Sequence, residues 1–386
     1  LSQVTAVTSP STETTPSYVF SSNDSGTISY TGSCTSSTTS ASSGNNSITF
    51  NALTCVNAPN CSATYSNCKI SVTDNANNTS DSLAVSSFTI TNLAHVGSGW
   101  QHSCAVDFGD VKCWGTNGWG NITGNLVTTT VQSTPVAISG LSGPTKVGIG
   151  LTFSCALLGN RTIKCWGQGN SGQLGNGALN NSANPVTVSG ISNATSIAGG
   201  RLHACALLSN RYIKCWGKAE EGQLGNGSTT GNSGNNQTTP VYVSGITNAI
   251  NISAGFQESC AVLENGSVKC WGAGFGTTPV NISSDIQNAS QVSTWGDQAV
   301  VLDNGSIIVR DNNGTIEYIP EISNAIQVSH DTNTSCAVLD NGSIACWGAG
   351  GSGQLGNGWE NNENTPVFVS NINNAKQGST FEGHSC

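Results

Sequence analysis

Cysteine pairs at a constant spacing constrain this chain more than any other feature. Five pairs are separated by nine or ten residues: Cys104 with Cys113, Cys155 with Cys165, Cys205 with Cys215, Cys260 with Cys270 and Cys336 with Cys346. Metal knuckles place two ligands about two to four residues apart, so this spacing does not fit a metal site. It fits two antiparallel strands joined by a tight turn, with the two cysteines facing each other.

The turn between Cys260 and Cys270 supports this interpretation. Glu264-Asn265-Gly266 can form a three-residue loop with glycine in the left-handed position. Counting outward from it places the two cysteines opposite each other at a non-hydrogen-bonded pair, where Cα atoms approach to about 4.5 Å. The first cysteine pair is one residue closer, and its loop, Phe108-Gly109, is a two-residue turn that again places Cys104 opposite Cys113.

Loss of both cysteines together also indicates disulfides. The segment from Ala299 to Val309 follows the same pattern but has neither cysteine. Each disulfide closes a short loop and should contribute at most about 2.8 kcal/mol by the chain-entropy model. Disulfides persist in oxidising compartments, so we expect an extracellular or cell-surface protein. Cys386 is left without a partner in the sequence.

The cysteine hairpins belong to longer repeats. The first cysteine of each hairpin, or Ala299 in its place, recurs at positions 104, 155, 205, 260, 299, 336 and 386. Most units contain an apolar strand, a turn, a Cys-Trp-Gly strand, a glycine-rich loop and a strand with Pro-Val, without helical periodicity. Units of about four strands that cannot bury their faces alone close best as a β-propeller.

Three long motifs recur in register and carry a family resemblance. Cys165-Trp166-Gly167, Cys215-Trp216-Gly217 and Cys346-Trp347-Gly348 are each followed by Gly-Gln-Leu-Gly-Asn-Gly, which ends at Gly177, Gly227 and Gly358. These units resemble regulator of chromosome condensation repeats. The resemblance implies a seven-bladed propeller over residues 93–386, although the fourth and fifth units lack Gly-Gln-Leu-Gly. The seventh unit stops at Cys386, so we expect an incomplete last blade that a longer chain or another subunit completes.

Residues 1–92 differ from the repeats in composition and pattern. They are rich in serine and threonine, and short segments with alternating apolar residues recur about every ten residues, as in Gly26–Tyr30 and Cys68–Val72. This spacing predicts an antiparallel β-sandwich, and the segment resembles bacterial Ig-like surface domains. We expect Cys34 to pair with Cys68 across the sandwich and Cys55 to pair with Cys61 within a loop. A mucin-like stalk is the alternative, which the apolar alternation disfavours.

Charge and motif content exclude several classes of protein. Twelve lysines and arginines stand against 21 acidic residues, so the clustered cations of a nucleic-acid binder are missing. No apolar run is long enough to insert into a membrane. Two Gly-x-Gly-x-x-Gly matches, at 167–172 and 348–353, arise from the repeat and precede no predicted helix, so they predict no dinucleotide cofactor. Acidic turns at Asp74 and Asp311 lack the regular spacing of a calcium loop. We expect no cofactor and no metal.

Aromatic and histidine side chains are weighed by whether they recur. Trp114, Trp166, Trp216, Trp271 and Trp347 occupy one repeat position, which favours packing between blades over sugar stacking. The tryptophans outside this position, Trp100, Trp119, Trp295 and Trp359, are better binding candidates. Of these, Trp119 and Trp359 lie in polar loops and are the predicted partner-binding residues. His102, His203 and His384 all precede a hairpin cysteine by two residues, so we expect a fixed polar role near the propeller axis.

Asparagine-linked glycosylation acceptors are frequent, although Asn-Gly-Ser is also an ordinary tight turn. The candidate acceptors are Asn121, Asn160, Asn226, Asn251, Asn265, Asn281, Asn304 and Asn341.

These features favour a non-enzymatic protein. The first hypothesis is an extracellular structural or adhesive glycoprotein that self-associates, as the subunit of a head-to-tail filament, with glycans as further candidate partners. The alternative is a secreted propeller that binds a protein through one face, as propellers with this repeat do with a small GTPase or, in a secreted bacterial inhibitor, with a β-lactamase. An enzyme is the weakest hypothesis, because no acid, base, nucleophile and metal set stands outside the repeats.

Overall fold

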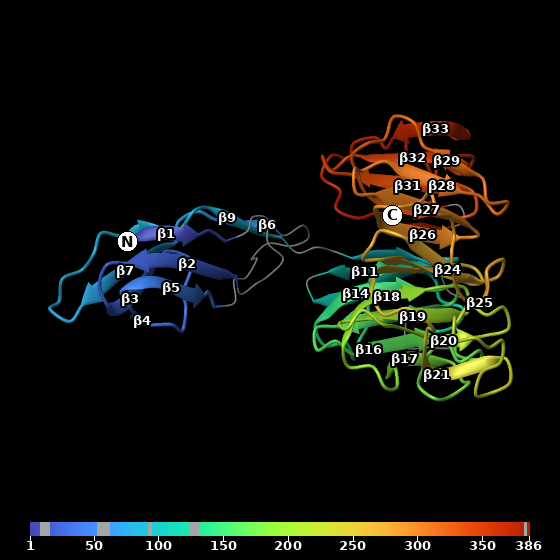
Figure 1. The fold of residues 1–386 in the computed structure, drawn as a ribbon, viewed down its shortest axis with the longest axis horizontal. Helices are drawn as coiled ribbons and strands as arrows, with labels where there is room; N and C mark the ends of the chain where they lie inside the picture. The colour runs from blue at the N-terminus through green and yellow to red at the C-terminus, as the bar shows by residue number, and fades with distance from the viewer. Residues whose placement is uncertain (8–15, 52–61, 92–94, 108, 123–130, 382–383) are drawn as a thin grey trace. The chain divides into compact units, whose positions relative to one another are not determined.

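The computed structural model describes residues 1–7, 16–51, 62–91, 95–107, 109–122, 131–381 and 384–386 (Figure 1). The described residues form strands and turns without a helix, so none of them lies in a helix that could span a membrane. The chain divides into two compact units, Leu1–Leu93 and Ala94–Cys386. The all-β class predicted from the sequence is confirmed.

The described residues of the first unit form nine short strands in three sheets. They are β1 (Ser2–Thr5), β2 (Ser17–Ser22), β3 (Gly26–Thr31), β4 (Ser40–Ala41), β5 (Gly44–Thr49), β6 (Ser62–Tyr65), β7 (Lys69–Asp74), β8 (Leu83–Ala84) and β9 (Phe88–Thr91). The sheets have the strand orders β1-β2-β5, β4-β3-β7-β8 and β6-β9. Alternate residues of β2, β3 and β7 point into one apolar core, as the period of two requires.

A disulfide lies in that core. Cys34 and Cys68 are bonded, with their Cα atoms 5.3 Å apart, and both are buried beside Phe50 and Phe88. The predicted pairing of Cys55 with Cys61 falls outside the described residues.

The described residues of the second unit form six four-stranded antiparallel sheets, each made of consecutive strands. We call them sheet 1 to sheet 6; in Figure 1 they run in order from teal near β11 to red at β33. Sheet 1 is β10 (Val96–Ser98), β11 (His102–Asp107), β12 (Asp110–Thr116) and β13 (Val131–Ala137); sheet 2 is β14 (Pro144–Ile149), β15 (Phe153–Leu158), β16 (Ile163–Gly167) and β17 (Ser182–Thr187); sheet 3 is β18 (Ala194–Gly199), β19 (His203–Leu208), β20 (Ile213–Lys218) and β21 (Asn236–Tyr242). Sheet 4 is β22 (Ala249–Ala254), β23 (Glu258–Leu263), β24 (Val268–Gly272) and β25 (Gly276–Asn281); sheet 5 is β26 (Ala289–Trp295), β27 (Asp297–Leu302), β28 (Ile307–Arg310) and β29 (Ile316–Tyr318); sheet 6 is β30 (Ala325–His330), β31 (Thr334–Leu339), β32 (Ile344–Gly348) and β33 (Glu363–Phe368).

The six sheets close into a ring with a two-stranded sheet of β34 (Thr380–Phe381) and β35 (His384–Ser385). The first strands of consecutive sheets contact one another, and β34 contacts both β30 and β10. Side chains on these inner strands, or just before them, accept backbone N–H groups on or just before the neighbouring inner strand. The pairs are Val96 N with Gln377, Val147 N with His95, Val292 N with Asn251, Val328 N with Gln291 and Gly378 N with Gln327. Amide side chains and the His95 imidazole therefore satisfy backbone N–H groups where strands meet side to side.

The cysteine hairpins adopt the predicted register. A cysteine of the second strand lies opposite a cysteine of the third strand in sheets 1, 2, 3, 4 and 6. All five pairs are disulfide-bonded: Cys104 with Cys113, Cys155 with Cys165, Cys205 with Cys215, Cys260 with Cys270 and Cys336 with Cys346.

The geometry of these hairpins differs from the expectation in one respect. The paired Cα atoms are 4.0 to 4.1 Å apart, closer than the roughly 4.5 Å expected of a non-hydrogen-bonded pair. Cys104 and Cys113 share this separation, at 4.1 Å, although their turn is one residue shorter and pairs Asp107 with Asp110. Gly266 has φ +73°, the left-handed conformation that the longer turn requires. The shorter turn therefore absorbs the missing residue without changing the cysteine pairing.

The strand order fixes two faces of the ring. In every sheet an inner loop joins the first and second strands, a hairpin joins the second and third, and an outer loop joins the third and fourth. Because neighbouring strands are antiparallel, inner and outer loops leave from the same edge and hairpins from the opposite edge. We call these the loop face and the hairpin face.

Candidate partner-binding surface

The recurring tryptophans form one lock between consecutive sheets. Trp166, Trp216 and Trp271 are fully buried. Each donates its indole N–H to a backbone oxygen in the outer loop of the preceding sheet, at 2.9 to 3.0 Å: Asn121 O, Gln173 O and Gln223 O. Their predicted role in packing between sheets agrees with these contacts.

The Gly-Gln-Leu-Gly motif is the other half of this lock. In sheet 2, Gln173 supplies the carbonyl, Leu174 is fully buried, and Gly175 has φ +64°. A Cβ atom on Gly175 would lie 2.8 Å from the indole of Trp216, so only glycine lets the loop lie against that ring. Gly225 and Trp271 repeat this contact between sheets 3 and 4. In sheets 2 and 3 the motif therefore holds the tryptophan of the following sheet in place.

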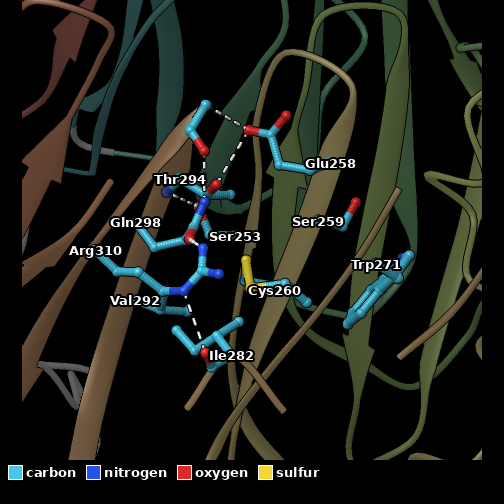
Figure 2. Close-up of a disulfide and its surroundings, with 12 residues drawn as sticks. Ser253, Glu258, Ser259, Cys260, Trp271, Ile282, Val292, Thr294, Gln298 and Arg310 are labelled. Atoms are coloured by element: carbon cyan, nitrogen blue, oxygen red, sulfur yellow. Dashed lines mark hydrogen bonds between the residues drawn. A yellow bond between two sulfur atoms is a disulfide. The ribbon is translucent and has the colours of Figure 1, made fainter. Parts of the chain in front are cut away.

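Sheet 5 has neither the disulfide nor the tryptophan of the other sheets. Figure 2 shows Arg310 beside Ile282 and Gln298. Ala299 and Val309 stand opposite each other where the other sheets have cysteines, and Arg310 takes the tryptophan position. Arg310 Nε donates to Ile282 O of sheet 4 at 3.2 Å, and Nη1 donates to Gln298 Oε1 at 3.0 Å. A guanidinium thus takes over the indole's role of donating to a backbone oxygen of the preceding sheet.

Replacing Arg310 by alanine should lower the free energy of unfolding by about 1–3 kcal/mol, because two hydrogen bonds are lost and Ile282 O loses a charged donor. Urea unfolding of the full chain measures this loss. Arg310→Lys keeps the charge but cannot donate to both acceptors in a fork, so it should lie between wild type and Arg310→Ala. Equal stability of wild type and Arg310→Ala would contradict the assigned role.

Histidines and serines form a second set of contacts between neighbouring sheets. His102 Nε2 lies 2.9 Å from Ser154 Oγ, and His203 Nε2 lies 2.8 Å from Ser259 Oγ. Ser259 Oγ donates to Gln223 O, so His203 Nε2 is the donor of its pair. His384 Nε2 lies 3.2 Å from Ser103 Oγ across the ring closure. In sheet 2 the histidine position is Phe153, and the serine position of sheet 3 is correspondingly Ala204.

The His102–Ser154 and His203–Ser259 pairs are buried structural contacts between sheets. His102, His203, Ser154 and Ser259 are buried, and the arrangement recurs with the repeat. Burial lowers the pKa of His102 to about 3 and of His203 to about 4, so both imidazoles are neutral at pH 7.

The inner loops of sheets 1 to 4 carry a different residue at the same repeat position. At their tips stand Trp100 in sheet 1, Leu151 in sheet 2, Arg201 in sheet 3 and Phe256 in sheet 4. Backbone hydrogen bonds connect these loops, from Trp100 N to Leu151 O, from Leu151 N to Arg201 O and from Arg201 N to Gly255 O. Trp100 is 47% exposed. This set, Trp100, Leu151, Arg201 and Phe256, is named the inner-loop surface.

Of the predicted partner-binding residues, Trp119 and Trp359 lie in outer loops, 41% and 71% exposed. Both loops belong to the loop face.

The expectation that Trp295 is available for binding is wrong. Its side chain is 6% exposed, because its ring makes edge contacts with Phe256 and Phe381 at centroid distances of 5.9 and 4.4 Å. Arg201, Phe256 and Leu151 were not predicted as binding residues. The sequence feature that could have identified them is that they occupy the same repeat position while the residue type there changes from sheet to sheet.

The remaining candidates are placed as follows. Asn160, Asn265, Asn304 and Asn341 are exposed in hairpins, Asn281 is exposed at the end of β25, and Asn226 is half-buried. Asn121 is 3% exposed and takes the place of the Gln of Gly-Gln-Leu-Gly, which leaves no room for a glycan in the folded chain. Asn251 accepts the N–H of Val292 between sheets. Cys386 is exposed and, among the described cysteines, the one without a disulfide.

Asp74 and Asp311 form turns. Asp74 Oδ1 accepts the N–H groups of Ala76 and Asn78, and Asp311 Oδ1 accepts those of Asn313 and Thr315. These hydrogen bonds lower the pKa of both carboxyl groups.

Sequence comparison identifies the repeats. The model of the regulator of chromosome condensation (RCC1) repeat matches residues 165–207, 215–262 and 341–385, and a second model of that repeat matches 145–173 and 194–223. Residues 145–262 and 341–385 therefore carry RCC1-like repeats. The resemblance noted from the Cys-Trp-Gly and Gly-Gln-Leu-Gly motifs is therefore confirmed for these residues. No curated protein matches the sequence.

Solved structures with low sequence identity share the fold of the second unit. Human WBSCR16 aligns with a TM-score of 0.64 and 16% identity, covering 74% of this chain and 84% of that chain. A chain from the complex of Kap60 with yeast RCC1 (Prp20) aligns at 0.63 and 18%, covering 75% and 78%. Prp20p of Saccharomyces cerevisiae aligns at 0.61 and 19%, covering 72% and 76%. The second unit is thus an RCC1-like β-propeller.

Proposed function

We propose that this protein is a non-enzymatic, extracellular propeller that binds a protein partner through its loop face. The observation that carries the proposal is the inner-loop surface, where Trp100, Leu151, Arg201 and Phe256 differ from sheet to sheet on a framework of recurring contacts. Variable aromatic and arginine side chains on a rigid scaffold are typical of binding hot spots. Trp119 and Trp359 lie on the same face and extend it. Related propellers support protein binding: yeast Prp20 is described with Kap60 and with Gsp1p and histones.

The proposal also includes an oxidising, extracellular compartment and a spacer role for the first unit. Five disulfides in the propeller and one in the first unit, counted over the described residues, favour an oxidising environment. Exposed Asn160, Asn265, Asn304 and Asn341 on the hairpin face can carry glycans without covering the loop face. We propose residues 1–92 as an Ig-like spacer and residues 93–386 as a seven-bladed propeller in which β34 and β35 belong to the last blade.

Affinity capture tests the loop face. The full chain is immobilised and incubated with culture supernatant, and bound protein is identified and quantified by mass spectrometry. We expect one partner near equimolar amount that is lost with Trp100→Ala and retained with Tyr318→Ala. Tyr318 is a matched exposed aromatic residue at the hairpin-face end of β29. Loss with Tyr318→Ala alone, or the same capture by all three proteins, would contradict the proposal.

Self-association into a structural or adhesive filament is the second candidate. It is favoured by the outer edge strands β21, β29 and β33, which end in the exposed aromatic residues Tyr242, Tyr318 and Phe368. Unpaired sheet edges are templates for pairing with another chain. Light scattering decides this candidate: a molar mass that rises with concentration supports it, and a constant monomer mass contradicts it.

A further inference from the structure

Arg201 is held in place on the loop face by its neighbours. The carbon of its guanidinium lies 4.3 Å from the centroid of the Phe256 ring, and that ring packs edge-on against buried Trp295. Its backbone N–H donates to Gly255 O. Its Nε atom is buried and has no hydrogen-bond partner among the described residues. The guanidinium is thus fixed on an aromatic ring.

This cation lacks an acidic partner within the described chain. The ion pairs found there join Lys112 to Asp107, Arg211 to Glu264 and Lys218 to Glu220. Arg201 is absent from them although acids outnumber cations by 21 to 12. An arginine that stacks on an aromatic ring keeps its fork of N–H donors for a carboxylate, which it can bind with two parallel hydrogen bonds.

The surroundings of Arg201 define the rest of the ligand. Trp100, Leu151 and Phe256 present apolar carbon, and the backbone N–H groups of Trp100 and Leu151 are already used between the loops. A sugar would need hydroxyl or amide groups to pair its own hydroxyls, and these side chains offer few. An aliphatic or aromatic side chain next to a carboxylate suits this surface better.

We propose that the inner-loop surface recognises a protein segment in which an aspartate or glutamate is flanked by apolar residues. Its carboxylate pairs with Arg201, and the apolar neighbours pack on Trp100 and Leu151. This inference rests on the proposed function, because it names the chemistry of the partner that the loop face binds.

A displayed library of random peptides tests it. The full chain is panned at pH 7, and the recovered peptides are measured by fluorescence anisotropy against wild type, Arg201→Gln and Arg161→Gln. Arg161 is a matched control, an exposed arginine in a hairpin on the opposite face. We expect the recovered peptides to contain acidic residues flanked by apolar ones. Compared with wild type, Arg201→Gln should bind these peptides at least tenfold more weakly, and Arg161→Gln should bind them equally well. Changing the peptide's own Glu to Gln should weaken binding similarly, and this arm is independent of folding of the variant.

The other outcomes separate the inference from the proposed function. Peptides that lack acids, bind Arg201→Gln as well as wild type and are lost with Trp100→Ala would overturn the carboxylate and leave the loop face as a protein-binding surface. Binding of sialyllactose that depends on Arg201, without any peptide recovered, would assign the carboxylate to a sugar and overturn the protein segment. Recovery of no ligand contradicts both proposals.

Discussion

Replacing Trp216 by alanine is expected to lower the free energy of unfolding of the propeller by about 3–5 kcal/mol. The indole is fully buried between sheets 2 and 3, in one apolar cluster with Leu174, and its N–H donates to Gln173 O. Truncation leaves a cavity and an unpaired carbonyl at the same junction, and both are costly. Urea unfolding followed by far-ultraviolet circular dichroism measures the change.

Two further variants make this result specific. Trp359→Ala removes a tryptophan that is exposed in an outer loop, so stability should change by no more than about 0.5 kcal/mol. Trp216→Phe keeps most of the ring but removes the N–H donor, so its loss should be smaller than that of Trp216→Ala. A loss below about 1 kcal/mol for Trp216→Ala would show that the lock does not hold the sheets together.

Acid should destabilise the propeller in the range between about pH 6.5 and pH 4. All five histidines, His95, His102, His203, His330 and His384, have pKa values lowered chiefly by burial, to about 3 for His102 and about 4 for His95, His203 and His330. In the unfolded chain they take up protons near pH 6.5. In the folded chain His95, His203 and His330 do so only near pH 4, His102 only near pH 3, and the pKa of His384 is also lowered. The unfolded state therefore binds more protons in this window, and stability falls as the pH falls through it.

The size of this loss of stability follows from how far burial lowers the pKa values of the histidines. A difference of one pKa unit between the folded and unfolded chains corresponds to about 1.4 kcal/mol. Acidification to pH 4 should therefore lower the free energy of unfolding by about 3 kcal/mol for a fully buried histidine such as His203. Melting temperatures between pH 7 and pH 4 measure the loss, which should amount to several kcal/mol in total.

The matched variant copies a pair that the chain already contains. Phe153 and Ala204 replace His and Ser between sheets 2 and 3, so His203→Phe combined with Ser259→Ala installs the same apolar pair between sheets 3 and 4. This double variant should fold at pH 7 and lose less stability on acidification than wild type. Identical pH profiles would show that His203 does not contribute to acid sensitivity.

Much of the fold follows from local sequence patterns. The cysteine register was predictable because a hairpin with a known turn admits one pairing, and the observed opposition of Cys260 and Cys270, and of Cys104 and Cys113 across the shorter turn, agrees with it. The repeat period and the glycine-rich motif likewise predicted a propeller of four-stranded units. Six sheets have four described strands each, whereas β34 and β35 form a two-stranded sheet.

The binding surface could be predicted only in part, for a physical reason. Trp119 and Trp359 were found because they stand in polar loops, where exposure is the usual outcome. Trp295 looked equivalent, yet Phe256 and Phe381, 39 residues before and 86 residues after it, cover its ring. Arg201 stacks on Phe256 and forms no ion pair with the described acids, and this arrangement depends on the fold. Such contacts depend on which loops the ring brings together, and no local pattern records them.

The tryptophan lock has a consequence for how such a chain can grow or shrink by duplication. Since the glycine-rich loop of one sheet holds the indole of the next, a cut between sheets separates the two halves of the lock. A cut just before Cys-Trp-Gly is different, because the excised length then begins with an indole and ends before the next one. The matched repeats 165–207 and 215–262 begin at such points. A duplicated or deleted segment with these ends leaves every glycine-rich loop in contact with a tryptophan. Sheet 5 differs, because Arg310 needs a preceding sheet whose backbone offers the oxygen of Ile282.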